Sequence, residues 1–401
     1  MTPKLLADIE KGTKGSLTKK KIIQYYLHAR SSTIPDLAKE LELSIPTVAK
    51  FLNDMMKEGV IANYGKLEAG EGRPPALYGL NPQAGYFVGV DIKKFSVDVA
   101  LMDLMGDVVT MKEDIPLLFE NTEAYLDALC QTVREFIDTT QFDHDRLLNI
   151  CVNISGRVNP QKGFSYILFN FDERPLAQVL TEKIGHPACI DNDTRAMAYG
   201  EMMKGVVKDE QDIIFINISW GLGAGLIFNG DVYMGKSGFS GEFGHFNVFD
   251  NEIICHCGKR GCLETEVSGA ALYRNLLQSL KEGKKSILSK RIEEGKEPLT
   301  LRDIVQATNR EDVLCIELVE GIGQKLGRYL AGLINLLNPD LVVIGGVLAQ
   351  TGDYLLQPVA TAVRKYSLNL VNRDTAIVLS RLGDRCGVIG ACLLARKHLL
   401  E

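Results

Sequence analysis

No stretch of the sequence approaches the roughly 18 consecutive apolar residues that a membrane-spanning helix needs, so an integral membrane protein is not expected. The opening residues, "MTPKLLADIEKGTKGSLTKKK", lack an apolar core ahead of a small-residue cleavage site and do not resemble a secretory signal. The nine cysteines are an odd number and are mostly scattered through apolar strings, which does not suit a disulfide framework. These absences predict a cytoplasmic protein.

A strongly basic segment is also absent. The formal net charge is −6, but residues 1–75 hold 12 Lys and Arg against 9 Asp and Glu, a balance of +3. The remaining residues hold 33 against 42, a balance of −9. A mildly basic head on an acidic body suggests that the head meets an anionic partner, although this charge alone does not identify it.

Residues 1–80 predict a winged helix-turn-helix domain. "LTKKKIIQYYLHAR" has apolar residues at helical spacing. Two further helices are predicted to start at Thr33 and Ser44, eleven residues apart, because each is a good N-cap and each has a proline in the following turn. The strand-like runs "IANYGKLEA" and "ALYGLNP" then flank the turn-rich "GEGRPP", which is the pattern of a wing.

In such a domain the second helix of the pair enters the major groove of DNA with its N-terminal residues leading. The side chains predicted to meet DNA there are Ser44, Thr47 and Lys50. Arg73, between glycine and proline, could enter the minor groove, whose narrow width attracts arginine. The alternative is a small helical domain for oligomerisation or peptide binding.

From residue 82 onward, strand-like and helix-like patterns alternate. "YFVGVDIKKFSVDVALMDLMGDVV" predicts a hairpin that turns at "MGD", and "DIIFINISWGLGAGLIFNGDVY" and "PDLVVIGGVL" predict strands that end at glycines. Segments such as "DVLCIELVEGIGQKLGRYLAGLINLL" have helical periodicity. The alternation predicts an α/β protein with two sheets.

Six motifs in this body carry a family resemblance: "GVD…DLMGD", "DNDTRAMAYGE", "ISWGLGAGLIFNG", "GEFGHFNV", "CHCGKRGCLE" and "VVIGG". Together they resemble the ROK family, which groups sugar-responsive repressors with sugar kinases on a two-lobed, actin-like (ribonuclease H-like) fold. The resemblance implies lobes over residues 81–195 and 196–401, with a C-terminal helix that could return to the first lobe. The winged head is similar to the repressor branch, which includes regulators of N-acetylglucosamine and xylose use.

The stretch "HFNVFDNEIICHCGKRGCLE" concentrates metal-binding residue types. A structural zinc site takes four Cys or His ligands and leaves no position for a reacting water. His256 competes by proximity for the role of fourth ligand, but the family pattern favours His245. The predicted ligands of a structural zinc ion are therefore His245, Cys255, Cys257 and Cys262.

The resemblance also implies a sugar site. Carboxylates suit it because each oxygen accepts hydrogen bonds and vicinal hydroxyls donate in pairs. Asp193 would accept the proton of the attacking hydroxyl in a kinase, and would simply bind that hydroxyl in a protein without activity. The "DND" segment could equally be a helix N-cap, and both roles are compatible. The implied sugar ligands are Asn170, on a looser alignment, and Asn192, Asp193, Glu242, His245 and Glu264.

The nucleotide site departs from the family pattern. Kinases of the family carry Asp-Ile-Gly-Gly-Thr in the first hairpin, but this chain has "DIKKFS", in which Lys93 and Lys94 replace the glycines and Phe95 the threonine. Leu222 stands where kinases usually carry a hydroxyl residue. Glycines of the other two nucleotide loops are kept: Gly221, Gly223, Gly225, Gly345 and Gly346.

The sequence therefore predicts a sugar-responsive DNA-binding transcriptional regulator, a repressor rather than an enzyme. Its predicted partners are operator DNA, a small-molecule sugar or sugar phosphate and a second copy of the chain, in a homodimer or homotetramer. It is predicted to hold structural zinc, to have no use for ATP and to bind no membrane. The alternative is an active ATP-dependent sugar kinase, of the glucokinase or N-acetyl-hexosamine kinase type, with an accessory DNA-binding head.

Overall fold

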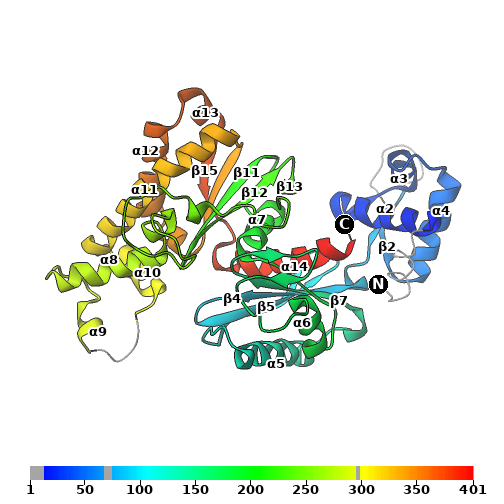
Figure 1. The fold of residues 1–401 in the computed structure, drawn as a ribbon. Coiled ribbons are helices and arrows are strands. Elements are labelled where there is room, and N and C mark those ends of the chain that lie inside the picture. The colour runs from blue at the N-terminus through cyan, green and yellow to red at the C-terminus, as the bar shows by residue number, and fades with distance from the viewer. Residues whose placement is uncertain (1–12, 67–74, 295–298, 401) are drawn as a thin grey trace. The chain divides into compact units, whose positions relative to one another are not determined.

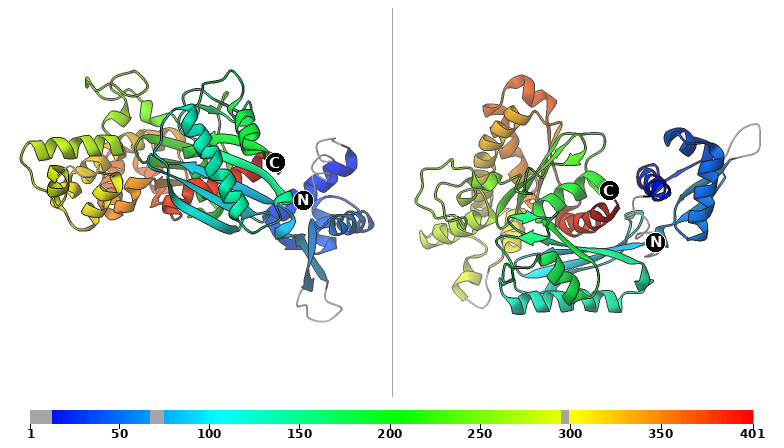
Figure 2. Two further views of the ribbon diagram at one scale, coloured as in Figure 1. Left: turned by 90° about the horizontal axis from the view of Figure 1, so that it is seen from below. Right: turned by 45° about the vertical axis from the view of Figure 1, so that its right-hand side comes forward.

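The computed structural model describes residues 13–66, 75–294 and 299–400 (Figures 1 and 2). Contacts between residues divide the chain into two units. One combines Met1–Asp191 with Ala391–Glu401, and the other is Asn192–Gly390. Within the described ranges, no helix combines the length and the apolar character needed to cross a membrane.

The head at the start of the first unit is a winged helix-turn-helix, as predicted. Thr33 and Ser44 cap two helices, because their side-chain oxygens accept hydrogen bonds from the N–H groups of Asp36 and Thr47. A proline occupies the first turn of both helices. The elements are α2 (Lys14–Ala29), α3 (Ile34–Glu40), α4 (Ile45–Lys57) and a sheet in the order β1 (Ser31–Ser32), β3 (Ala76–Leu80), β2 (Ile61–Lys66).

The first lobe follows the head and is built on a five-stranded sheet. We expected one hairpin over residues 86–109, but the chain also turns at residues 93–95, so that the segment forms three antiparallel strands. The next strand pairs parallel to the first of these. The sheet order is β10 (Ala188–Asn192), β7 (Leu147–Ile154), β4 (Tyr86–Ile92), β5 (Ser96–Asp103), β6 (Val108–Pro116), and the short strands β8 (Val158–Asn159) and β9 (Phe164–Ser165) pair separately.

Helices cover this sheet on both faces. Alternate strand residues such as Val88 and Val90 pack on α5 (Glu123–Thr139) and α6 (Leu176–Ile184). The end of α14 (Cys386–Leu400) also belongs to this unit, where the Cys392 thiol lies 3.4 Å from the Ala100 carbonyl.

The second lobe has the same plan: a five-stranded sheet with an antiparallel edge and a parallel edge (Figure 1). The order is β13 (Asp231–Val232), β12 (Leu222–Phe228), β11 (Ile213–Ile218), β14 (Leu341–Gly345), β15 (Ala376–Leu379). The helices are α7 (Asp193–Lys204), α8 (Gly269–Lys281), α9 (Ser289–Glu294), α10 (Leu301–Asn309), α11 (Val313–Leu337), α12 (Asp353–Tyr366) and α13 (Asn369–Asp374). Ile214 and Ile216 of β11 face α8, α10, α11 and α12, whereas Phe215 between them faces α7.

Helix α11 approaches α12 closely through two of its glycines. A Cβ at Gly323 would lie 3.0 Å from the Leu355 carbonyl oxygen, and a Cβ at Gly327 would meet the Val359 carbonyl and lie 2.7 Å from the Ala362 Cβ. Gly321, on the same helix, has open space around the same position. Substitutions at Gly321 and Gly327 therefore distinguish the effect of helix propensity from the effect of packing.

Replacing Gly327 with alanine is expected to lower the free energy of unfolding by about 1–3 kcal/mol, because the added methyl group collides with backbone. The Gly321→Ala control should gain up to about 1 kcal/mol from the higher helix propensity of alanine. Thermal unfolding of both variants measures the difference, and a Gly327→Ala protein as stable as the control would contradict the packing argument.

Candidate functional site

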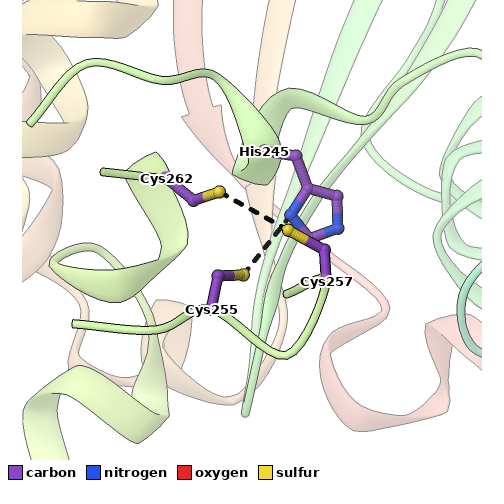
Figure 3. Close-up of side chains that lie close together, drawn as sticks. All are labelled: His245, Cys255, Cys257 and Cys262. Atoms are coloured by element: carbon purple, nitrogen blue, oxygen red, sulfur yellow. Dashed lines mark hydrogen bonds between the residues drawn. The ribbon is translucent and has the colours of Figure 1, made fainter. Parts of the chain in front are cut away.

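The four side chains predicted to bind metal lie together in the second unit (Figure 3). Their ligand atoms all fall within 4.8 Å of one another. The Cys255 sulfur is 3.6 Å from Nδ1 of His245, and the sulfurs of Cys257 and Cys262 are 3.6 Å apart. His245 ends the short helix η3 (Phe243–His245), and Cys262 caps η4 (Leu263–Thr265).

Tight turns bring the three sulfurs to one point. Gly258 and Gly261 have φ values of 84° and 74°, which L side chains rarely adopt. Hydrogen bonds from the Cys255 N–H to Lys259 and from the Gly258 N–H to Cys255 close the loop, at 2.8 Å each. Isolated bridges also pair Asn247 with Cys262 and Ile254 with Arg260, and residues 245–264 are called the knuckle below.

Two of the three knuckle thiols are shielded from water. Cys255 and Cys262 are buried. Burial raises the pKa of the Cys255 thiol to about 12, so the thiol remains protonated at neutral pH in the absence of a cation. Metal binding at this cluster would displace that proton.

His245 presents its two ring nitrogens to different partners. Nδ1 faces the cysteine cluster, and Nε2 lies 3.5 Å from a carboxylate oxygen of Glu242. A carboxylate behind an imidazole ligand fixes the ring orientation, as is usual at metal sites. Glu242, a predicted sugar ligand, is thereby tied to the knuckle.

Glu264 is held on both carboxylate oxygens. Oε2 accepts a hydrogen bond from the Leu222 N–H at 2.8 Å, and Oε1 lies 2.7 Å from Nδ1 of His256. Burial raises the pKa of Glu264, but the hydrogen bonds from His256 and Leu222 outweigh it and hold that pKa below the ordinary value. The same contact with Glu264 raises the pKa of His256.

The "DND" segment ends β10 and begins α7. Asn192 caps the helix by accepting the Arg195 N–H at 3.0 Å, so the N-cap interpretation is confirmed. Asp193 occupies the first turn and accepts the Thr194 N–H at 2.7 Å. Thr194 in turn accepts a hydrogen bond from the Asn217 amide of β11 at 3.1 Å.

The glycines of the predicted nucleotide loops are packed against other parts of the second unit. A Cβ at Gly223 would lie 2.7 Å from Oγ1 of Thr194, and a Cβ at Gly225 would lie 2.5 Å from Ala198. Gly221 stands equally close to Glu264. At the end of β14, a Cβ at Gly345 would meet the Phe215 ring, and the next residue, Gly346, with a φ of 86°, faces Asn217 and Ser219. Close packing therefore explains these glycines without a phosphate.

In the first unit, a lysine of the altered hairpin loop forms an ion pair with an aspartate of β5. Nζ of Lys93 lies 2.5 Å from Oδ2 of Asp98, whose side chain is fully buried. The Asp114 N–H donates to the other oxygen of Asp98 at 2.8 Å. Lys94 lies over the Phe95 ring, 5.3 Å from its centre.

The remaining predicted site residues lie in the first unit. Asn170 is exposed in the loop after β9. At the start of α4, Ser44 and Lys50 are exposed and Thr47 is half-buried; the hydroxyls of Ser44 and Thr47 are 2.7 Å apart. Arg73 lies outside the described residues.

Sequence reasoning missed three contacts of the second unit. His256 was considered only as a rival metal ligand, yet it contacts Glu264. Trp220, the only tryptophan of the chain, precedes Gly221 and packs on Tyr273 with ring centres 5.8 Å apart. The guanidinium of the buried Arg195 donates to the Gly238 carbonyl. The one sequence signal for any of these contacts was the position of His256 between Cys255 and Cys257.

Comparisons with known proteins agree on a family. The model of the ROK family matches residues 87–398, and a model described as winged helix-turn-helix DNA-binding matches residues 16–62. A xylose repressor from Bacillus subtilis is 28% identical over 91% of each chain. A glucokinase from Halalkalibacterium halodurans is 30% identical over 78% of this chain and 96% of its own.

Among solved structures, a ROK family transcriptional regulator, described as a homologue of the E. coli MLC protein, superposes with a TM-score of 0.79. It is 27% identical, and the match covers 95% of this chain and 96% of that one.

Replacing Lys93 with alanine is expected to lower the free energy of unfolding by about 3 kcal/mol, because the Asp98 carboxylate stays buried without its cation. The Lys94→Ala control removes an exposed lysine that lies over the Phe95 ring and should lose about 1 kcal/mol or less. Chemical denaturation measures both. Equal stability of the two variants would show that Lys93 does not compensate the buried charge.

Proposed function

The chain belongs to the ROK family, and we propose that it is a DNA-binding transcriptional regulator, a repressor, that responds to a sugar. The proposal rests on one combination: a winged helix-turn-helix head and a complete ROK body in a single chain. Relatives named as repressors match more than nine-tenths of the chain, whereas the glucokinase match covers 78% of it.

The head would bind operator DNA through α4. Ser44, the N-cap of α4, and Lys50, in its second turn, are exposed near the half-buried Thr47, and the first turn has no acidic residue to repel phosphate. Arg73 of the wing would add a minor-groove contact. Two heads of a homodimer or homotetramer would read a pseudo-palindromic operator.

The knuckle would hold a structural zinc ion. A tetrahedral site with zinc–sulfur bonds of about 2.3 Å has edges of about 3.8 Å. The 3.6 Å separations within the cluster fit such edges, and the donor set of one imidazole and three thiols is one that zinc prefers. With all four positions supplied by protein, the ion would hold the knuckle together and take no part in a reaction.

The sugar would bind beside the knuckle. Glu242 and Glu264 contact knuckle residues, and their carboxylates can accept sugar hydroxyls. Thr194, the neighbour of Asp193, packs on Gly223, one residue from the Leu222 N–H that binds Glu264. The proposed ligands in this unit are Glu242, His245 and Glu264, with Asn192 and Asp193 at the start of α7. Asn170 stays a prediction of the family resemblance.

We further propose that the protein is not a kinase and does not use ATP. In the first loop a lysine engages a buried aspartate, and side chains stand where family kinases bring backbone to phosphate. A sensor needs binding but not turnover, since a ligand shifts a conformational equilibrium by its differential affinity alone. Asp193 and the glucokinase relative favour the second candidate, an active sugar kinase with a DNA-binding head.

Titration calorimetry of the zinc-loaded protein against hexoses, pentoses, N-acetylated amino sugars and their phosphates tests this function. We expect one class of sugar to bind, and no binding of an ATP analogue. Glu264→Ala should weaken the sugar by at least about tenfold, because a charge-assisted hydrogen bond is lost.

Glu252→Ala is the matched control, because Glu252 is a carboxylate of the same segment with 84% of its side chain exposed. It should bind sugar like the wild type. Sugar-dependent ATP turnover at an ordinary enzymatic rate would establish the kinase instead.

Removing one sulfur tests the metal. Cys257→Ser should lose its zinc, and its free energy of unfolding should fall by on the order of 3 kcal/mol. That is the stabilisation that a ligand gives when its free concentration is about a hundred times its Kd. His256→Ala should keep a full complement of zinc. Elemental analysis and thermal unfolding read both results, and a serine variant with full zinc and unchanged melting would refute the structural role.

A further inference from the structure

His256 stands between two knuckle cysteines but faces a carboxylate. Its Nδ1 is 2.7 Å from Oε1 of Glu264 and 3.8 Å from the Cys255 sulfur, so the carboxylate is the nearer partner. The His256 ring meets the His245 ring edge to face, with centres 5.1 Å apart. Cys255 and Cys257, on either side of His256, are two of the four clustered metal-binding candidates, so the backbone of His256 is held next to that cluster.

The carboxylate has capacity left for a ligand. An ionised carboxylate offers about four lone-pair positions. The N–H of Leu222 and Nδ1 of His256 occupy one position on each oxygen of Glu264. One position per oxygen then remains for a pair of hydroxyls. The Cys255 thiol, 3.7 Å from Oε1, would no longer donate once its sulfur were bound to a metal as a thiolate.

Glu264 also contacts the turn that carries the only tryptophan. Gly221 leaves room for Oε2, which would lie 2.7 Å from a Cβ at that position. Trp220 precedes this glycine, and its carbonyl accepts the Ala270 N–H at 3.0 Å. Its side chain is 37% exposed. Glu264 is therefore linked to the fluorescent side chain of Trp220 through one residue, Gly221.

We propose that His256 is a positioning residue of the sugar site: it holds the Glu264 carboxylate in the orientation that accepts two hydroxyls of the effector. This inference rests on the proposed sugar-binding function. Both carboxylate oxygens are restrained before the sugar arrives, so less side-chain entropy is lost on binding. The sequence suggested His256 only as a rival metal ligand, and its role at the sugar site follows from its contact with Glu264.

The matched pair of variants is His256→Ala and His256→Asn. Alanine removes the donor, whereas the asparagine amide places an N–H near the position of Nδ1. Both full-length proteins would be loaded with zinc and titrated with D-glucose, N-acetyl-D-glucosamine, their 6-phosphates and D-xylose. Trp220 fluorescence and calorimetry would report the binding.

For a sugar that binds the wild type, we expect His256→Ala to raise the Kd roughly tenfold, the value of one hydrogen bond to a charged group. His256→Asn should recover most of that affinity, and all three proteins should hold the same amount of zinc. A merely structural role would not give recovery by asparagine.

Acrylamide quenching of Trp220 without sugar provides a second readout. Quenching should increase in His256→Ala and return toward the wild-type value in His256→Asn. If none of the sugars binds the wild type, the proposed sugar site fails, while quenching still tests the contact between His256 and Glu264. Loss of zinc in His256→Ala, or wild-type affinity and quenching in that variant, would overturn the inference.

Discussion

The Glu264 carboxylate accepts the Leu222 N–H at 2.8 Å, and this bond joins the knuckle to the first residue of β12. The next residue, Gly223, packs on Thr194 at the start of α7. Two segments far apart in sequence therefore meet at one end of one strand. The candidate site depends on this meeting, because it brings a carboxylate from the knuckle and the start of a capped helix to the same edge of the sheet.

Glycines make the close approach of Glu264 and Thr194 to β12 possible. Gly221 directly precedes β12, Gly223 and Gly225 lie on it, and each has protein atoms near the position of a Cβ. In a kinase of this family, glycine loops also serve phosphate, so the same residues satisfy two constraints. In this chain the glycines of the second unit still satisfy the packing constraint, whereas Lys93 of the first loop pairs with Asp98 of β5. Such a division fits a body that binds a ligand without turning it over.

The local elements were predictable because their signals are local. Thr33 and Ser44 cap helices through atoms three residues away, and Asn192 caps α7 in the same way. The four metal-binding candidates were also predictable, because three lie within eight residues and a turn-forming glycine fixes each bend. The third strand of the first sheet was missed, since "KKF" has none of the usual turn residues and the turn follows from pairing across the sheet.

The sequence by itself determined the head, the α/β body and the set of metal-binding residue types in the knuckle, since residue type and short spacing decide helix caps, periodicity and which of these side chains cluster. Tertiary structure alone decided what Glu264, His256 and Lys93 contact. Their partners are a backbone N–H, a carboxylate and a buried aspartate that come close only when the segments fold together. A side chain's role depends on the atom that it faces, and for these three residues that atom is fixed by the packing of the lobes' own strands and loops.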